Sequence, residues 1–199
     1  MAKIKFTKNE LKKQKDSLKR FLRYLPTLML KKQQLQMEIR KIEAQQAELR
    51  RKRELLFREI LQWIAVFGED VGFSELISVE SLETEIGNIA GVDIPVFQDI
   101  RYEVAPYDLF ELPLWVDTAI DKVKELASLD AQIDILEKQV DLLGEELRIT
   151  SQRVNLFEKV KIPETRENIR MIQIYLGDEQ TAAVVRGKIA KKKLVRVSQ

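Results

Sequence analysis

Between Leu126 and Phe157, apolar residues recur at alternating steps of three and four, and this spacing restricts the fold more than any other feature of the sequence. The alternation keeps one narrow apolar stripe along a helix, which is the seam of a coiled coil. Nine of the ten seam positions are apolar, and the tenth is a threonine. The ten positions are Leu126, Leu129, Ile133, Leu136, Val140, Leu143, Leu147, Thr150, Val154 and Phe157.

A second seam runs through the N-terminal third of the chain. From Asn9 to Phe67 there is no glycine, and Pro26 is the only proline. One heptad series reads Phe21, Leu28, Leu35, Ile42, Leu49, Leu56 and Trp63. Its companion series reads Leu11, Leu18, Leu25, Lys32, Ile39, Gln46, Arg53 and Ile60. The pattern predicts a second long helix, bent at Pro26 because proline removes a backbone donor and pushes on the preceding turn.

Two seams separated by a short middle segment are most simply closed as an antiparallel hairpin. Pairing Trp63 with Trp115, and Phe21 with Phe157, gives residue numbers that sum to 178 in both cases. One register therefore accounts for both aromatic pairs. It leaves the C-terminal helix extending beyond the N-terminus by roughly 15 to 25 residues, on the order of 30 Å.

This register also places charged seam residues beside acids. Lys32 falls near Glu145 and Glu146, and Arg53 falls near Glu125. Paired charges inside a seam fix register and orientation. The alternative is that these long side chains reach out to solvent.

The middle of the chain differs in charge from the helix before it. Residues 67–111 contain eleven acidic residues and one basic residue, whereas residues 1–66 contain 18 basic and seven acidic residues. Within the middle, Ser81–Ile89 and Val92–Glu103 are rich in β-forming residues and flank Ala90-Gly91, which predicts a short hairpin with Gly91 supplying a positive φ.

An isolated hairpin is marginal in water, so one face must pack on the long helices or on a partner protein. An acidic segment is most often a solvated surface, but its apolar residues favour a docking surface. The residues predicted for that surface are Gly91, Ile94, Pro95, Val96 and Phe97.

The C-terminal end combines a proline with a basic run. The seam is interrupted after Phe157 and resumes in a shifted phase at Ile169, Ile172 and Leu176, with a kink expected at Pro163. The run comprises Arg186, Lys188, Lys191, Lys192 and Lys193. It is a solvated end, or it contacts nucleic acid, an anionic membrane or an acidic pocket on a protein.

The predicted fold class is mainly α, a long antiparallel two-helix coiled-coil hairpin with a small middle segment containing a short β-hairpin. The predicted parts are an N-terminal helix (1–67), an acidic middle segment (68–111), a C-terminal helix kinked near residue 163 (112–193) and a basic tail (194–199).

The composition excludes several kinds of chemistry. With no cysteine and no histidine, disulfides, thiol nucleophiles, Cys/His metal sites and imidazole catalysis are absent. No cluster of carboxylates converges, so no catalytic residue, metal ligand or cofactor is predicted. The sequence also lacks a signal peptide and an apolar run long enough to span a bilayer, which predicts a cytosolic protein.

Four motifs resemble the D subunit of the V-type/A-type ATPases. They are AGVDIPVF at Ala90–Phe97, RVNLFEKVKIP at Arg153–Pro163, IRMIQIYLGDEQ at Ile169–Gln180 and VRGKIAKKK at Val185–Lys193. The order of helix, hairpin, helix and basic tail is similar along essentially the whole chain. The family usually carries Leu-Leu-Lys-x-Lys-Arg-Asp near Leu28–Leu35, whereas Leu30–Gln34 lacks the Arg-Asp, which indicates a divergent, bacterial member.

The resemblance implies a non-catalytic rotor shaft, similar in role to the gamma subunit of F-type enzymes. The implied partners are the A/B hexamer around the two termini, the F subunit on the shaft, and a socket subunit (C/d type) above the proteolipid ring. Membrane association would occur only through the complex. On this view the basic run is a rotor tip inside the hexamer. The competing interpretation is a stand-alone coiled-coil adaptor or a nucleic-acid-associated protein with basic ends, although the acidic middle disfavours a continuous nucleic-acid track.

Overall fold

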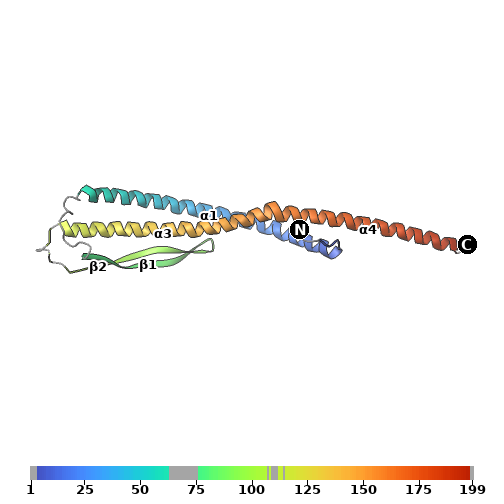
Figure 1. The fold of residues 1–199 in the computed structure, drawn as a ribbon, viewed down its shortest axis with the longest axis horizontal. Helices are drawn as coiled ribbons and strands as arrows, with labels where there is room; N and C mark the ends of the chain where they lie inside the picture. The colour runs from blue at the N-terminus through green and yellow to red at the C-terminus, as the bar shows by residue number, and fades with distance from the viewer. Residues whose placement is uncertain (1–3, 63–75, 107, 109–111, 114, 198–199) are drawn as a thin grey trace. The chain divides into compact units, whose positions relative to one another are not determined.

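The computed structural model describes residues 4–62, 76–106, 108, 112–113 and 115–197. Its elements are α1 (Lys8–Gln62), β1 (Ile77–Ile89), β2 (Val92–Val104), α3 (Trp115–Asn155), the π-helical η1 (Leu156–Lys161) and α4 (Ile162–Val197) (Figure 1). The predicted fold class, mainly helical with a small antiparallel hairpin between two long helices, is confirmed.

The chain forms two compact units, which are described separately. The terminal unit comprises Met1–Lys31 and Thr150–Gln199, and the middle unit comprises Lys32–Ile149. The predicted boundaries at 67/68 and 111/112 lie among or beside residues outside the described ranges. Helix α4 continues to Val197, so it extends past the predicted start of the tail at residue 194.

In the terminal unit, α1 begins at a defined cap and then packs beside the C-terminal helix. The Thr7 hydroxyl accepts a hydrogen bond from the Glu10 backbone N–H at 3.2 Å, which satisfies one of the free donors of the first turn. The ring centroids of Phe21 and Phe157 lie 5.2 Å apart, so the predicted aromatic pair is confirmed. A second pair, Phe6 and Tyr175, lies at 5.0 Å.

The shifted seam of this unit has a structural cause that the sequence analysis did not anticipate. Between Phe157 and Ile162 the chain forms a π-turn, and the Ile162 N–H donates to the Phe157 carbonyl five residues back. A π-turn holds one more residue than an α-turn, so the seam steps by five here and then resumes its alternation. The buried positions after the turn are Ile162, Thr165 and Ile172, with Ile169 and Leu176 partly buried.

The two prolines sit in uninterrupted helix. Helix α1 continues through Pro26, and the next residue, Thr27, donates its hydroxyl to the Tyr24 carbonyl at 2.8 Å. Pro163 is the second residue of α4 and follows the π-turn directly, and the Thr165 hydroxyl donates to the Lys161 carbonyl at 2.6 Å. The sequence predicts a kink at Pro163, and η1 ends two residues before this proline. A π-turn is itself a cause of bends in helices.

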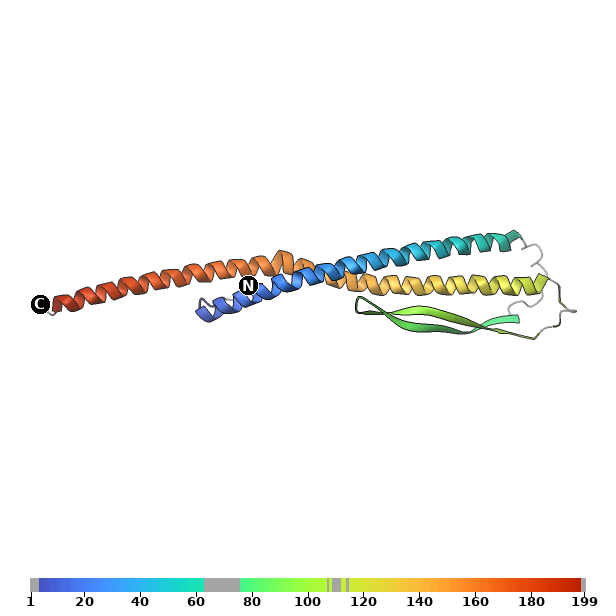
Figure 2. The same ribbon diagram turned by 180° about the vertical axis from the view of Figure 1, so that it is seen from behind.

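In the middle unit the hairpin lies along α3, as both views of the ribbon show (Figures 1 and 2). One apolar cluster joins all three elements: Leu35 and Ile42 of α1, Leu143 of α3 and Ile94 of β2 are each at most 4% exposed. Of the two alternatives predicted for the hairpin, the long helices or a partner protein, the structure shows packing on the long helices. Partly buried residues around the cluster are Ile39, Ile89, Ala90, Val92, Val96, Leu136, Val140 and Leu147.

The hairpin closes through a two-residue turn. Ile89 pairs with Val92, and Ala90 and Gly91 between them have φ of 53° and 80°. Two positive φ values define the turn type whose twist matches the flanking strands. The positive φ predicted for Gly91 is confirmed, and Ala90 shares it. Strand β1 begins at Ile77, four residues before the predicted start, and the ladder contains two irregularities.

The partner predicted for Arg53 is wrong. Its guanidinium bonds Asp130, with Nε to Oδ1 at 2.9 Å, rather than Glu125. Two residues whose numbers sum to 178 are partners only if they lie directly opposite each other on the two helices. An arginine side chain is long enough to reach a carboxylate more than one turn farther along the partner helix. Glu145 bonds Arg148 on its own helix. The Trp63–Trp115 pair lies outside the described residues, because Trp63 does.

Candidate interaction surfaces

The site residues predicted from the sequence are surface and seam residues, with no catalytic residue or metal ligand among them. Among its residues, no three acidic side chains gather closely enough to hold a metal ion. None of the described helices has an apolar stretch long enough to cross a membrane.

The predicted coiled-coil seam forms the interior of both units. Every described seam residue is buried or partly buried, and Leu35, Ile42, Leu56, Ile133, Leu143 and Val154 are at most 8% exposed. Thr150, the polar member of the second seam, is 1% exposed. The seam is therefore occupied by the chain itself.

The basic run near the end of α4 is fully accessible. Its members, Arg186, Lys188, Lys191, Lys192 and Lys193, are all exposed, and within the described residues none of them forms an ion pair with a carboxylate. At about 100° per residue these positions point to all sides of the helix. We call this set the basic ring.

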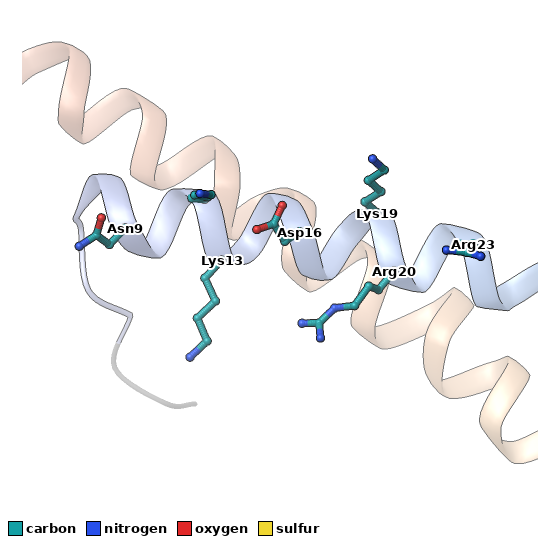
Figure 3. Close-up of a pocket in the computed structure, with 7 residues that line it drawn as sticks. Asn9, Lys13, Asp16, Lys19, Arg20 and Arg23 are labelled. Atoms are coloured by element: carbon teal, nitrogen blue, oxygen red, sulfur yellow. The ribbon is translucent and has the colours of Figure 1, made fainter.

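A second set of cations lies on α1 of the terminal unit and was missed by the sequence analysis. Seven exposed residues line a shallow, open groove of about 680 Å³ on one side of the helix (Figure 3). They are Asn9, Lys12, Lys13, Asp16, Lys19, Arg20 and Arg23. Their spacing of three and four residues is visible in the sequence, but a net charge summed over a whole segment conceals it. We call this set the basic stripe.

The cations of α1 differ between the two units. In the middle unit, five of them are paired with carboxylates at 2.7 to 3.7 Å: Lys41 with Glu38, Arg50 with Glu137, Lys52 with Glu48, Arg53 with Asp130 and Arg58 with Glu54. From Lys8 to Arg23, no described lysine or arginine has such a partner. Two of these five pairs, those of Arg50 and Arg53, cross from α1 to α3. The bond to Asp130 raises the pKa of Arg53.

The predicted docking surface on the hairpin mostly faces the chain's own helices. Ile94 is 3% exposed within the cluster, and the Pro95 carbonyl accepts a hydrogen bond from the Gln139 amide at 2.5 Å. Val96 and Phe97 are partly buried, and Gly91 is exposed at the turn. Ile94, Val96 and Phe97 also line a groove of about 560 Å³ bounded by α1 and α3.

Two polar residues bond the hairpin to α3, and neither bond was predicted from the sequence. Gln139 is 6% exposed, and Tyr102 donates its hydroxyl to the Lys124 carbonyl at 2.7 Å. Burial, followed by the nearby charge of Asp99, raises the pKa of the Tyr102 phenol. The sequence did contain one sign that a second side of α3 is covered, namely a second series of apolar residues. Its buried members include Val116, Ile120 and Ile135.

The accessible apolar residues of the hairpin lie on β1 instead. Val79, Leu82 and Ile86 are 55%, 42% and 79% exposed. Acidic residues such as Glu83 and Glu85 neighbour them along the strand. This part of the hairpin is open to solvent, unlike the residues predicted for docking.

Comparison with known proteins gives a consistent result. The sequence profile of the family of the ATP synthase D subunit matches residues 10–192. The V-type ATP synthase D subunit of Borreliella burgdorferi is 55% identical over 196 residues, covering 98% of this chain and 97% of that protein. The proteins of the same name from Chlamydia trachomatis serovar L2 and Chlamydia pneumoniae are 36% and 34% identical, and each comparison covers at least 93% of both chains.

These relatives match the chain from end to end, and the family profile includes both long helices and the hairpin between them. The resemblance seen in the four sequence motifs is confirmed. The chain belongs to the family of ATP synthase D subunits.

Proposed function

We propose that this chain is the central-stalk rotor subunit of a rotary V-type ATPase, transmitting torque between a catalytic A/B hexamer and a membrane ring that moves ions. The observation that carries the proposal is the 55% identity to a V-type ATP synthase D subunit over 98% of the chain. In this role the chain itself is not catalytic, and ATP is made or hydrolysed in other subunits.

The internal packing suits a shaft. Torque is transmitted without loss only if paired helices do not slip past each other, and a seam of interlocking apolar side chains resists such sliding. Buried seam residues such as Leu35 and Leu143 in the middle unit, and Val154 and Ile172 in the terminal unit, supply that packing. The cross-helix bond of Arg53 to Asp130 opposes sliding further, because it fixes one register.

The basic ring suits a tip that turns inside a stator. Exposed lysines and arginines make weak, salt-sensitive contacts, so they bind acidic groups without holding them permanently. We place Arg186, Lys188 and Lys191–Lys193 against acidic groups of the A and B subunits. The F subunit and a socket subunit above the proteolipid ring are the further partners, and the protein is cytoplasmic and peripheral to the membrane through the complex.

Reconstitution tests the proposal directly. The purified chain is mixed with an A/B hexamer, and copurification, ATP hydrolysis and rotation of a bead attached to the chain are measured. Binding with stepwise rotation is the expected result. Absence of binding, together with a salt-dependent shift of duplex DNA by the chain alone, would favour the stand-alone nucleic-acid-associated protein instead.

A further inference from the structure

We infer that the basic stripe of α1 is a contact surface for carboxylates of the surrounding stator, and that it gives the shaft one positively charged side. The inference rests on the proposed function and extends it to an angular preference of the rotor. It is carried by three observations on the terminal unit: the position of the stripe on α1, the absence of carboxylate partners for its cations among the described residues, and its difference from the basic ring.

The stripe lies on the side of α1 that faces away from the seam. Half-buried Leu11, Leu18 and Phe21 mark the seam side of this segment, with Phe21 against Phe157. At about 100° per residue, the stripe residues centre on the opposite side of the helix. Figure 3 shows Asp16, Lys19 and Arg23 projecting from that exposed side. The stripe therefore points outward, where a surrounding protein would lie.

The charge of the stripe is not neutralised by the described residues. It contains five cations and a single acid, Asp16, and none of the cations forms an ion pair within the described ranges. Lys12, Lys13, Lys19 and Arg23 also have no side-chain hydrogen bond there, and Arg20 bonds only the Ser17 hydroxyl at 3.2 Å. Such cations attract an anionic surface without first breaking an internal pair.

The composition favours a protein surface over a phosphate backbone. Asp16 stands in the middle of the stripe, where it would repel a continuous run of phosphates. A protein surface supplies both carboxylates for the cations and donors for Asp16 and Asn9. Arginine carries a planar fork that binds a carboxylate through two parallel hydrogen bonds, which suits Arg20 and Arg23.

The stripe and the basic ring differ in symmetry. The ring presents charge on all sides of α4, so its attraction to a stator varies little as the shaft turns. The stripe presents charge on one side, so its attraction is greatest when that side faces an acidic group. In a stator with three similar A/B pairs, this makes three shaft angles favourable, and the stripe contributes to where the rotor pauses.

A pair of matched variants tests the inference. The stripe variant is Lys19→Gln with Arg23→Gln, and the control is Arg40→Gln with Arg51→Gln on the same helix. All four residues are exposed, none forms an ion pair within the described residues, and glutamine preserves helix propensity. The two variants thus remove equal charge from α1 in different units, and unchanged helix content and melting temperature verify that both are folded.

Three measurements on the reconstituted complex are compared: affinity for the A/B hexamer at low and high salt, ATP hydrolysis, and the distribution of pause angles in single-molecule rotation. The stripe variant should bind about five- to tenfold more weakly at low salt, with a smaller loss on adding salt, and its pause angles should spread more widely. The control variant should match the unmodified chain in all three.

The results separate this inference from the proposed function. If the unmodified chain binds and rotates but the stripe variant equals the control, the stripe is not a contact surface while the rotor role stands. If the unmodified chain fails to bind the hexamer, the rotor role itself fails. Weaker binding of the stripe variant to duplex DNA, with hexamer binding unchanged, would also overturn the inference in favour of a nucleic-acid contact.

Discussion

Tyr102 shows how a single residue couples the hairpin to α3. Its hydroxyl donates to the Lys124 carbonyl at 2.7 Å, and burial raises the pKa of the phenol. We expect Tyr102→Phe to lower the free energy of unfolding at neutral pH by about 1 kcal/mol, because a part-buried hydrogen bond is lost. Urea denaturation of both proteins measures this difference.

The pH dependence of that difference is a separate prediction. A phenol whose pKa is raised in the folded state stabilises the fold below its unfolded pKa of about 10, and that stabilisation is lost as the pH rises through the folded pKa. The unmodified chain should therefore lose stability as the pH rises above about 10, and Tyr102→Phe should lose less. An equal loss in both proteins would assign the alkaline destabilisation to other groups.

The turn residue Gly91 permits a clean measurement of backbone strain. A Cβ at Gly91 would have no neighbour within 4 Å, but φ is +80°, so Gly91→Ala should lower the unfolding free energy by about 1 to 2 kcal/mol through strain alone. Gly144 of α3 also has open space around a Cβ, at a helical position. Gly144→Ala should therefore raise the unfolding free energy by about 0.5 to 1 kcal/mol. Thermal melts of the two variants should shift in opposite directions.

At the scale of the element, the two sides of the hairpin should respond differently to truncation. Ile94 is 3% exposed in the cluster with Leu35 and Leu143, so Ile94→Ala should lower the unfolding free energy by about 2 to 5 kcal/mol. Ile86 is 79% exposed, so Ile86→Ala should change it by at most about 0.5 kcal/mol. Similar losses in both variants would mean that the hairpin does not pack as described.

The π-turn leads to a prediction about the deletion of single residues. Deleting exposed Lys159 from η1 converts the seam step of five into a step of four, so an ordinary α-helix keeps the alternation. Deleting exposed Arg166 from α4 instead moves every later seam residue by about 100°. We expect the first deletion to preserve the melting temperature and the second to lower it clearly. Equal damage from both would refute the compensating role of the turn.

These elements show what could be predicted from sequence and what could not. The long helices could be predicted because the 3,4 alternation of apolar residues does not depend on the details of packing. The turn at Gly91 could be predicted because backbone sterics favour glycine at a positive φ. The shift in the phase of the seam after Phe157 could be seen in the sequence. That a π-turn accommodates this shift depends on how the backbone relaxes around the packed Ile162 and could not be predicted. The bond of Gln139 to the Pro95 carbonyl was not predictable, since it joins residues 44 positions apart.

At the scale of the whole molecule, net charge conceals where the charge lies. The total of +2 follows directly from composition, and the segregation into basic and acidic segments follows from counting along the chain. Which cations are already paired required side-chain positions. Arg53 and Lys41 are bonded to acids, whereas the basic stripe and the basic ring have no carboxylate partner among the described residues. Of these two basic surfaces, the basic ring was predicted from its run of lysines and the basic stripe was not predicted.

The basic ring yields a prediction for the complete complex. Replacing Arg186, Lys188, Lys191, Lys192 and Lys193 by glutamine removes the all-round charge of this part of α4, and the variant should bind an A/B hexamer more weakly or couple ATP hydrolysis to ion movement less tightly. Because the contacts are exposed, the defect should be largest at low ionic strength, where the unmodified chain gains most from its charges. Hydrolysis and ion pumping measured together across a salt series distinguish weak assembly from loose coupling. Unchanged rates and unchanged coupling at every salt concentration would show that the ring turns without touching the stator, and that torque enters the shaft elsewhere.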